Sequence, residues 1–226
     1  SVTMLKPEHI SAYSLILEEG TPFYDQYHGH PELLPDEHEE REMYYVTKQF
    51  LHSHGFERYE ISNYAKKGYA CRHNTGYWQR KEYLGTGLGA ASLMNEIRYS
   101  NIRDLKEYIE KSQYIEEKRI NDELSGQSIG GINLHADARK IDRNAQMEEF
   151  MFLGLRMTEG VSVSEFQAVF GESMEKIYGN VIKKNLEDGL LEYRETDKWT
   201  ETGGRRLALT KRGIDVSNMV MAEFLL

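Results

Sequence analysis

The sequence predicts an α+β fold: a fragment of an α/β barrel or layered sheet, followed by a winged-helix-like, mainly helical C-terminal domain. Two observations support this prediction. Near the start of the chain an apolar run of β-forming residues, a helix-like segment and a second β-forming run follow one another, whereas the C-terminal part changes to regular helical spacing. Alternating strands and helices are typical of α/β units, and a separate run of helices indicates a second domain.

The first strand is expected over residues 9–17, a nearly continuous apolar run bounded by Pro7 and by Glu19-Gly20. A strand that is apolar on both faces is typical of a parallel sheet, which is covered on both sides. Only eight residues precede it, so its natural neighbours are expected outside this chain. Because an open apolar edge pairs readily with other strands, we expect the chain to dimerise or exchange elements through residues 10–17.

A helix is expected to begin at Asp36, because Glu39 follows three residues later in the arrangement of a capping box. Gly55 is expected to end this helix, and residues 56–64 should form a second strand. Strand, helix and strand together make one βα-type unit. The apolar side chains at helical spacing within the helix are Met43, Val46, Phe50 and Leu51.

A short helix is expected over residues 101–112, buried through Ile102, Leu105 and Ile109. Hydrophobic periodicity is then lost over about residues 121–144, where Gly and Ser accumulate, and this is typical of a linker. The predicted divisions of the chain are residues 1–120, the linker 121–144 and the C-terminal domain 145–226.

The C-terminal domain is expected to hold three helices, a hairpin over residues 190–193 and 206–210, and a last helix from about Lys211. Ser162 and Glu165 form a second capping box. This order of elements is that of a winged-helix module.

A DNA-reading module normally has a basic face, but residues 145–226 hold 14 acidic and 10 basic side chains. Packing or docking of a partner is therefore favoured over nucleic-acid binding.

The composition excludes several other classes of protein. The formal net charge of -9 disfavours non-specific binding to nucleic acids or anionic membranes. No apolar run approaches the ~20 residues that cross a bilayer, and no signal peptide opens the chain, so we expect a cytoplasmic protein without a membrane span. The single cysteine excludes an internal disulfide and an all-cysteine metal cluster built by this chain alone.

Residues 59–90 have the composition of a small-molecule site, with aromatic faces, a few polar groups and bare backbone. Cys71 and His73 do not have strong zinc spacing, so no metal site is predicted. His73 is favoured instead as an axial ligand or hydrogen-bond donor to a flat cofactor, because Tyr77 and Trp78 supply faces beside it. The glycines of residues 85–89 depart from the dinucleotide fingerprint. They indicate either a tight turn or backbone pressed against an adenosine or a tetrapyrrole.

Four segments carry a resemblance to a known family. Residues 7–24, 59–65 (YEISNYA), 71–78 (CRHNTGYW) and 82–90 (EYLGTGLGA) resemble the later part of the oxygen-independent coproporphyrinogen III oxidase family of radical S-adenosylmethionine proteins. Residues 147–156 are similar to the opening of that family's C-terminal domain. The His-Asn-x-x-Tyr-Trp motif at residues 73–78 is more typical of the branch regarded as heme chaperones.

The resemblance implies a partial (β/α) barrel that holds S-adenosylmethionine and a four-iron four-sulfur cluster, followed by a helical C-terminal domain. It implies a role in porphyrin or heme biosynthesis, by oxidative decarboxylation of coproporphyrinogen III, or in heme trafficking. The residues expected on the S-adenosylmethionine side are Tyr13, Ile16, Gly87, Gly89 and Leu93. The residues expected to meet heme or a porphyrin are His73, Asn74, Tyr77 and Trp78.

The family's cluster motif is Cys-x-x-x-Cys-x-x-Cys, whereas this chain has only Cys71. We therefore expect the chain alone not to hold the cluster and not to perform radical chemistry. The expected partners are a tetrapyrrole and either an N-terminal barrel portion or a second copy of the chain. The competing hypothesis is a non-enzymatic winged-helix module that docks a protein or a nucleic acid.

Overall fold

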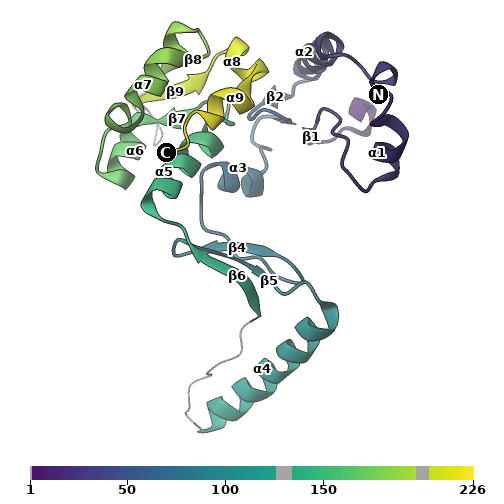
Figure 1. Cartoon of the computed structure of the whole chain (residues 1–226), viewed down its shortest axis with the longest axis vertical. Helices are drawn as coiled ribbons and strands as arrows, with labels where there is room; N and C mark the ends of the chain where they lie inside the picture. The colour runs from purple at the N-terminus through teal and green to yellow at the C-terminus, as the bar shows by residue number, and fades with distance from the viewer. Residues whose placement is uncertain (1, 126–133, 197–203) are drawn as a thin grey trace. The chain divides into compact units, whose positions relative to one another are not determined.

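The computed structural model describes residues 2–125, 134–196 and 204–226 (Figure 1). The chain forms two compact units. Residues 1–79 and 148–226 make up the first unit, and residues 80–147 make up the second.

The N-terminal part of the first unit contains a small antiparallel sheet in the order β1-β3-β2. Ile10 and Arg58 both lie opposite Tyr64 of the central strand. Leu51, Phe56 and Tyr64 form a buried cluster beside this sheet, with Ile10 and Ala12 packed against it. The elements in chain order are a 3-10 turn Val2–Leu5, β1 His9–Ser11, α1 Pro22–Tyr27, a 3-10 turn Pro31–Leu33, α2 Glu37–Ser53, β2 Glu57–Arg58, β3 Asn63–Ala65 and α3 Arg72–Trp78.

The predicted long parallel strand over residues 9–17 is wrong. Strand β1 has three residues and pairs antiparallel with β3, and the Ala12 amide makes a last hydrogen bond to the Ser62 carbonyl (2.8 Å). Beyond that bond the chain leaves the sheet, and the side chains of Tyr13 and Ile16 are 70% and 77% exposed. Apolar sequence alone therefore did not determine how long the strand runs, because strand length depends on the partner.

The second predicted strand, residues 56–64, is also wrong as a single element. It is a tight hairpin of β2 and β3. The Glu60 carboxylate lies in the connection and accepts hydrogen bonds from the Ser62 amide (2.7 Å) and from the Asn63 side chain (2.5 Å). These bonds fold the chain back on itself in the middle of the predicted strand.

The predicted start and end of helix α2 are confirmed. The Asp36 carboxylate accepts from the Glu39 amide (2.8 Å), the Glu39 carboxylate accepts from the Asp36 amide (3.0 Å), and Gly55 follows the helix at φ +82°. Of its apolar face, Leu51 is buried. Three other apolar side chains of this helix are exposed: Met43, Val46 and Phe50. Together with Tyr13, Leu15 and Ile16, which are exposed in the segment after β1, we call these side chains the N-terminal apolar face.

Replacing Asp36 by alanine is expected to lower the free energy of unfolding by about 1 kcal/mol, because the Glu39 amide loses its acceptor. Urea denaturation followed by circular dichroism measures the change. Glu42→Ala is the matched control, since Glu42 is an exposed residue within the same helix. Equal effects of the two substitutions would contradict a capping role for Asp36.

The second unit, residues 80–147, is built on an antiparallel sheet in the order β4-β5-β6. Asn95 and Glu96, both at positive φ, form the two-residue turn between β4 and β5, as hairpins of this length require. The elements are β4 Ala91–Met94, β5 Ile97–Asn101, α4 Leu105–Ser125 and β6 His135–Lys140.

The predicted helix over residues 101–112 begins later and is less buried than expected. Asn101 ends strand β5, and the helix starts at Leu105, where the Asp104 carboxylate accepts from the Glu107 amide (2.8 Å). Ile102 is buried, but Leu105 and Ile109 are exposed. Part of the predicted linker is regular, because α4 extends to Ser125 and β6 begins at His135, while residues 126–133 lie outside the described part of the chain.

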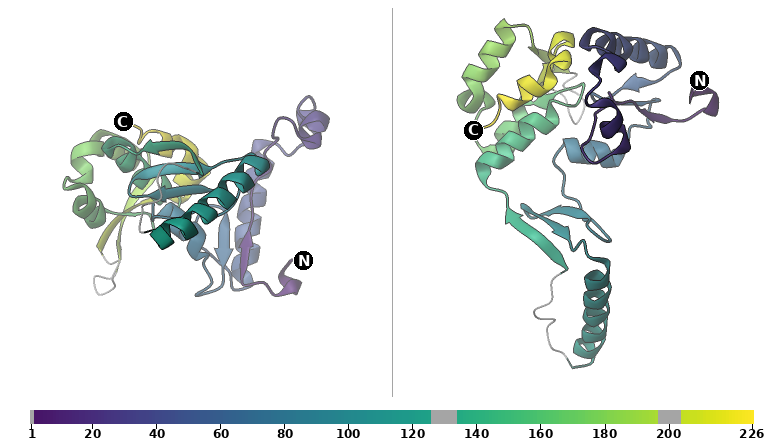
Figure 2. Two further views of the ribbon diagram at one scale, coloured as in Figure 1. Left: turned by 90° about the horizontal axis from the view of Figure 1, so that it is seen from below. Right: turned by 45° about the vertical axis from the view of Figure 1, so that its right-hand side comes forward.

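The C-terminal part of the first unit surrounds a three-stranded antiparallel sheet in the order β7-β9-β8. In both further views the green and yellow helices lie around this sheet (Figure 2). The predicted three helices and hairpin are present, and the last predicted helix is divided near Val216. The elements are α5 Arg143–Gly154, β7 Val161–Ser162, α6 Val163–Phe170, α7 Met174–Glu187, β8 Leu191–Thr196, β9 Gly204–Leu209, α8 Lys211–Asp215 and α9 Ser217–Ala222.

Candidate functional site at helix α3

The β2–β3 connection holds a fully buried carboxylate, that of Glu60. One of its oxygens accepts the two hydrogen bonds that close the hairpin. The other oxygen lies 3.4 Å from Nη2 of Arg156, which follows helix α5. A buried carboxylate is costly unless a cation and hydrogen bonds compensate it. Arg156 therefore neutralises the charge in the middle of the hairpin.

Backbone contacts join the same hairpin to the segment after α5. The Ile61 amide donates to the Arg156 carbonyl (3.2 Å), and the Thr158 amide donates to the Tyr59 carbonyl (3.0 Å). Glu60 and Met157 form an antiparallel bridge. The N-terminal sheet and the C-terminal elements are thus connected through main chain as well as through an ion pair.

Both ends of helix α3 contact the β2–β3 hairpin or the segment after α5. At its C-terminal end the Arg156 guanidinium lies over the Trp78 ring, 4.4 Å from the ring centroid. At its N-terminal end the helix contacts Tyr59 of the hairpin, whose hydroxyl also lies 2.9 Å from Nε2 of His9 on strand β1. Burial raises the pKa of Tyr59, while its hydrogen bonds with the Cys71 backbone and the Asn74 side chain lower it. Asn74 thus contacts the hairpin rather than only facing outward.

His73 and Tyr77 lie between these two attachments. Their rings meet edge to face, with centroids 4.5 Å apart and an interplanar angle of 75°. His73 is exposed, whereas Tyr77 is partly buried. The arrangement presents one accessible imidazole, flanked by an aromatic ring, on a helix that is held at both ends. An accessible imidazole nitrogen is chemically able to act as an axial ligand of heme iron.

The structure brings four of the predicted site residues together, because His73, Asn74, Tyr77 and Trp78 all lie on α3. Of the residues expected on the S-adenosylmethionine side, Tyr13 and Ile16 lie in the exposed segment after β1, in the first unit. The remaining three, Gly87, Gly89 and Leu93, belong to the second unit.

The glycine-rich loop of the second unit is held by side chains of its own sheet. Gly85 passes so close to β4 that an added Cβ would lie 2.2 Å from the Ala91 carbonyl oxygen. The Asn101 side chain donates to the Gly87 carbonyl (2.8 Å), and Gly87 and Gly89 both adopt positive φ. Leu93 is buried within β4. The glycines thus allow a tight turn, one of the two interpretations of the sequence.

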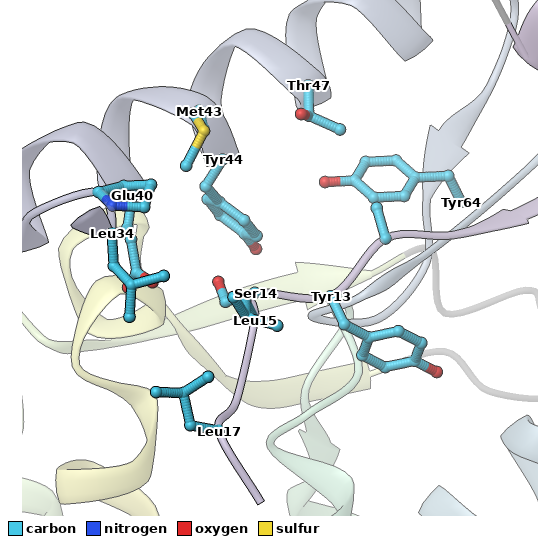
Figure 3. Close-up of a pocket in the computed structure, with 12 residues that line it drawn as sticks. Tyr13, Ser14, Leu15, Leu17, Leu34, Glu40, Met43, Tyr44, Thr47 and Tyr64 are labelled. Carbon is cyan, nitrogen blue, oxygen red and sulfur yellow. The ribbon is translucent and has the colours of Figure 1, made fainter. Parts of the chain in front are cut away.

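A pocket of about 400 Å³ lies between helix α2 and the segment after β1 (Figure 3). The Tyr44 and Tyr64 rings face it, whereas the Tyr13 ring points away from α2. Tyr44 donates to the Ile61 carbonyl (2.9 Å) and accepts from Arg58, and burial raises the pKa of Tyr44 to about 12. The lining is mainly apolar, and it also includes Leu15, Leu17, Leu34 and Met43.

The sequence analysis did not identify two residues of the site, Glu60 and Arg156. A signal for Glu60 was present, because a carboxylate inside a predicted buried strand needs a partner. Nothing in the sequence showed that the partner lies 96 residues away.

Within residues 2–125, 134–196 and 204–226, no group of three or more His, Cys, Asp or Glu side chains could hold a metal ion. None of the helices in the described ranges is long and apolar enough to cross a membrane.

Comparison with protein families identifies a HemN C-terminal domain over residues 141–216. Two curated relatives are the heme chaperone HemW of Lactococcus lactis (strain IL1403), 34% identical over 222 residues, and that of Bacillus subtilis (strain 168), 34% identical over 221 residues. Each alignment covers 98% of this chain and 52% of the relative. The chain therefore spans about half the length of these relatives.

Among solved structures, coproporphyrinogen III oxidase (HemN) from Escherichia coli, described as a radical SAM enzyme, shares the fold. The TM-score is 0.66 at 15% identity, and the match covers 99% of this chain and 49% of the other. The described residues show no closed barrel, but their mixed α/β arrangement is that of part of HemN. The chain belongs to the family of the HemW and HemN proteins and corresponds to the C-terminal part of its members.

Proposed function

We propose that this chain is the heme-binding C-terminal part of a heme-chaperone-type member of this family, and that helix α3 carries the heme contact. The observation that supports this most directly is the exposed His73 imidazole beside Tyr77, on a helix held at both ends. A histidine nitrogen is a common axial ligand of heme iron. His73 would bind the iron, and Tyr77 would contact the porphyrin edge.

The alternative within the family is oxidative decarboxylation of coproporphyrinogen III. The fold match to HemN supports it, but at 15% identity the match concerns the fold alone. The relatives at 34% identity carry the name heme chaperone, and so we prefer heme trafficking. No observation on the C-terminal elements specifically favours the nucleic-acid-binding module.

S-adenosylmethionine and a four-iron four-sulfur cluster belong, in this proposal, to the complete protein. The single cysteine of this chain does not fit a cluster held by three thiolates. Residues of an N-terminal barrel portion would supply those thiolates, and this chain would contribute the S-adenosylmethionine side. The residues proposed for that side are Tyr13, Ile16, Gly87, Gly89 and Leu93.

The N-terminal apolar face is the surface that we propose for the barrel portion, with a second copy of the chain as the other candidate. Its exposed side chains come from α2 and from the segment after β1, where the sheet ends. In this proposal residues 1–120 are a barrel remnant, residues 145–226 form a winged-helix-like domain that docks partners, and the protein is cytoplasmic.

His73→Ala is expected to weaken heme binding at least about tenfold, because the proposed iron ligand is removed. Titration of hemin into the purified chain, followed by the shift of the Soret band, measures the affinity. His38→Ala is the matched control, because His38 is the exposed second residue of α2 as His73 is of α3. An unchanged titration of His73→Ala, or an equal loss in His38→Ala, would refute the assignment.

A further inference from the structure

We propose that Arg156 is the positioning residue through which the C-terminal elements set the orientation of helix α3. Arg156 follows α5 and acts through two partners, Trp78 on α3 and Glu60 in the β2–β3 connection. The inference deepens the proposed function and rests on it only for its heme-binding consequence. The geometry itself is tested without heme.

The guanidinium of Arg156 makes two different contacts. Its central carbon lies over the Trp78 ring, 4.4 Å from the ring centroid, and its Nη2 donates to the second oxygen of Glu60. Because a guanidinium is planar and rigid, the bond to Glu60 restricts how the group can lie over the indole. Glu60 in turn is held by the Ser62 amide and the Asn63 side chain. The hairpin therefore determines the orientation of the indole.

Because the Glu60 carboxylate is buried, breaking its ion pair with Arg156 would cost considerable free energy. The Glu60 side chain is 0% exposed and that of Arg156 is 24% exposed. Separating the two would leave a buried carboxylate without a cation, which is far more costly than losing a surface ion pair. Arg156 is therefore held at the Trp78 ring by the charge of Glu60, whether or not a ligand is present.

Stacking, rather than hydrogen bonding, holds the indole. In the described part of the chain, the indole nitrogen of Trp78 and Nε of Arg156 are both buried without a hydrogen-bond partner. Since no hydrogen bond fixes the ring, its orientation depends on packing, which includes the contact with the guanidinium. Loss of that contact is expected to release the C-terminal end of α3.

Helix α3 depends on such attachments because it has only seven residues. A helix of this length is not stable by itself in water. Its first turn is attached through Asn74 and Tyr59, and its last residue through the stack on Arg156. His73 and Tyr77 lie between these attachments, so the direction of the imidazole depends on both.

The fluorescence of Trp78 tests the positioning directly. The chain has two tryptophans, so Trp199→Phe leaves Trp78 as the only one. In that background Arg156→Gln is expected to shift the emission to longer wavelength and to increase acrylamide quenching. Arg205→Gln is the matched control, because Arg205 makes a cation–π contact with Tyr193 (3.5 Å) in the C-terminal part, away from α3.

A double variant separates positioning from loss of folding. Glu60→Gln with Arg156→Gln removes both charges, so that no uncompensated charge stays buried. It is expected to recover the unfolding midpoint relative to Arg156→Gln and still to show the altered Trp78 emission. Arg156→Lys keeps the charge but not the flat stack, and should show the same altered emission. Wild-type emission in a folded Arg156→Lys or double variant would overturn the proposal.

The heme consequence is measured separately. If α3 binds heme, the double variant should bind hemin about tenfold more weakly than the wild type, in line with the loss of a partly buried cation–π contact. Failure of the wild-type chain to bind hemin would refute the proposed function and leave the emission result standing. Unchanged emission together with normal heme binding would refute the role of Arg156 alone.

Discussion

Replacing Gly160 by alanine is expected to lower the free energy of unfolding by at least about 4 kcal/mol, in the range reserved for severe backbone and core changes. Gly160 adopts φ +74°, and an added Cβ would lie 2.1 Å from the Leu207 carbonyl oxygen and 2.7 Å from Cα of Ala208. Both contacts are with strand β9, the central strand of the C-terminal sheet. The side chain cannot be accommodated without moving that strand away from β7.

The Gly160 carbonyl also has a partner that such a shift would disturb. The Arg206 side chain donates to it at 2.6 Å and donates to the Glu159 carbonyl at 3.1 Å. Arg206 is buried, so its guanidinium would lose acceptors that water cannot readily replace. The steric effect and the loss of hydrogen bonds therefore act in the same direction.

Urea denaturation followed by circular dichroism tests this prediction, with Gly179→Ala as the control. Gly179 lies within helix α7, and no heavy atom is within 4 Å of the position that its Cβ would take. Alanine there should stabilise the helix by about 0.5–1 kcal/mol. If Gly160→Ala were as stable as the wild type, strand β9 would have to move without cost to accommodate the added Cβ, and the prediction would be wrong.

Phe166→Ala is expected to destabilise the C-terminal part by about 3–5 kcal/mol, through lost burial and the cavity left behind. Phe166 is fully buried on helix α6. Its ring centroid lies 4.7 Å from that of Phe170, 5.5 Å from that of Phe150 and 6.1 Å from that of Tyr178. These rings come from three helices, so truncating Phe166 removes the contact that they share.

The control for Phe166→Ala is Val169→Ala on the same helix. Val169 is 58% exposed, so its truncation should change the free energy of unfolding by no more than about 0.5 kcal/mol. Near-ultraviolet circular dichroism should also report the loss of aromatic packing in Phe166→Ala. Similar urea midpoints for the two variants would contradict a central role for Phe166.

Local signals in the sequence predicted local structure well. The capping box of Asp36, the end of α2 at Gly55 and the hairpin of β8 and β9 all depend on neighbouring residues, and all three are present. Strand β1 and helix α4 were predicted less well. Their length and burial depend on which other elements cover them, and hydrophobicity at positions such as Ile16 and Leu105 does not specify the covering element.

For the candidate site, too, the sequence pointed to residues that share one element and missed residues that meet through the tertiary fold. His73, Asn74, Tyr77 and Trp78 were recognisable because one short motif places them on one helix. Glu60 and Arg156 were not, because they meet only when the hairpin packs against the end of α5. Sequence spacing reports neighbours within an element, whereas the partner of a buried charge is determined by the tertiary fold.

The contacts around Arg156 also bear on where one evolutionary module ends and one folding unit begins. The HemN C-terminal domain is matched over residues 141–216, yet Phe224 lies beyond this range and packs its ring against Tyr178, with centroids 5.2 Å apart. Glu60 and Trp78, on the other side, lie far upstream of it. The matched domain is therefore shorter than the unit that packs together. Glu60 of the ion pair, together with Trp78 and Phe224 of the aromatic packing, lies outside the matched residues.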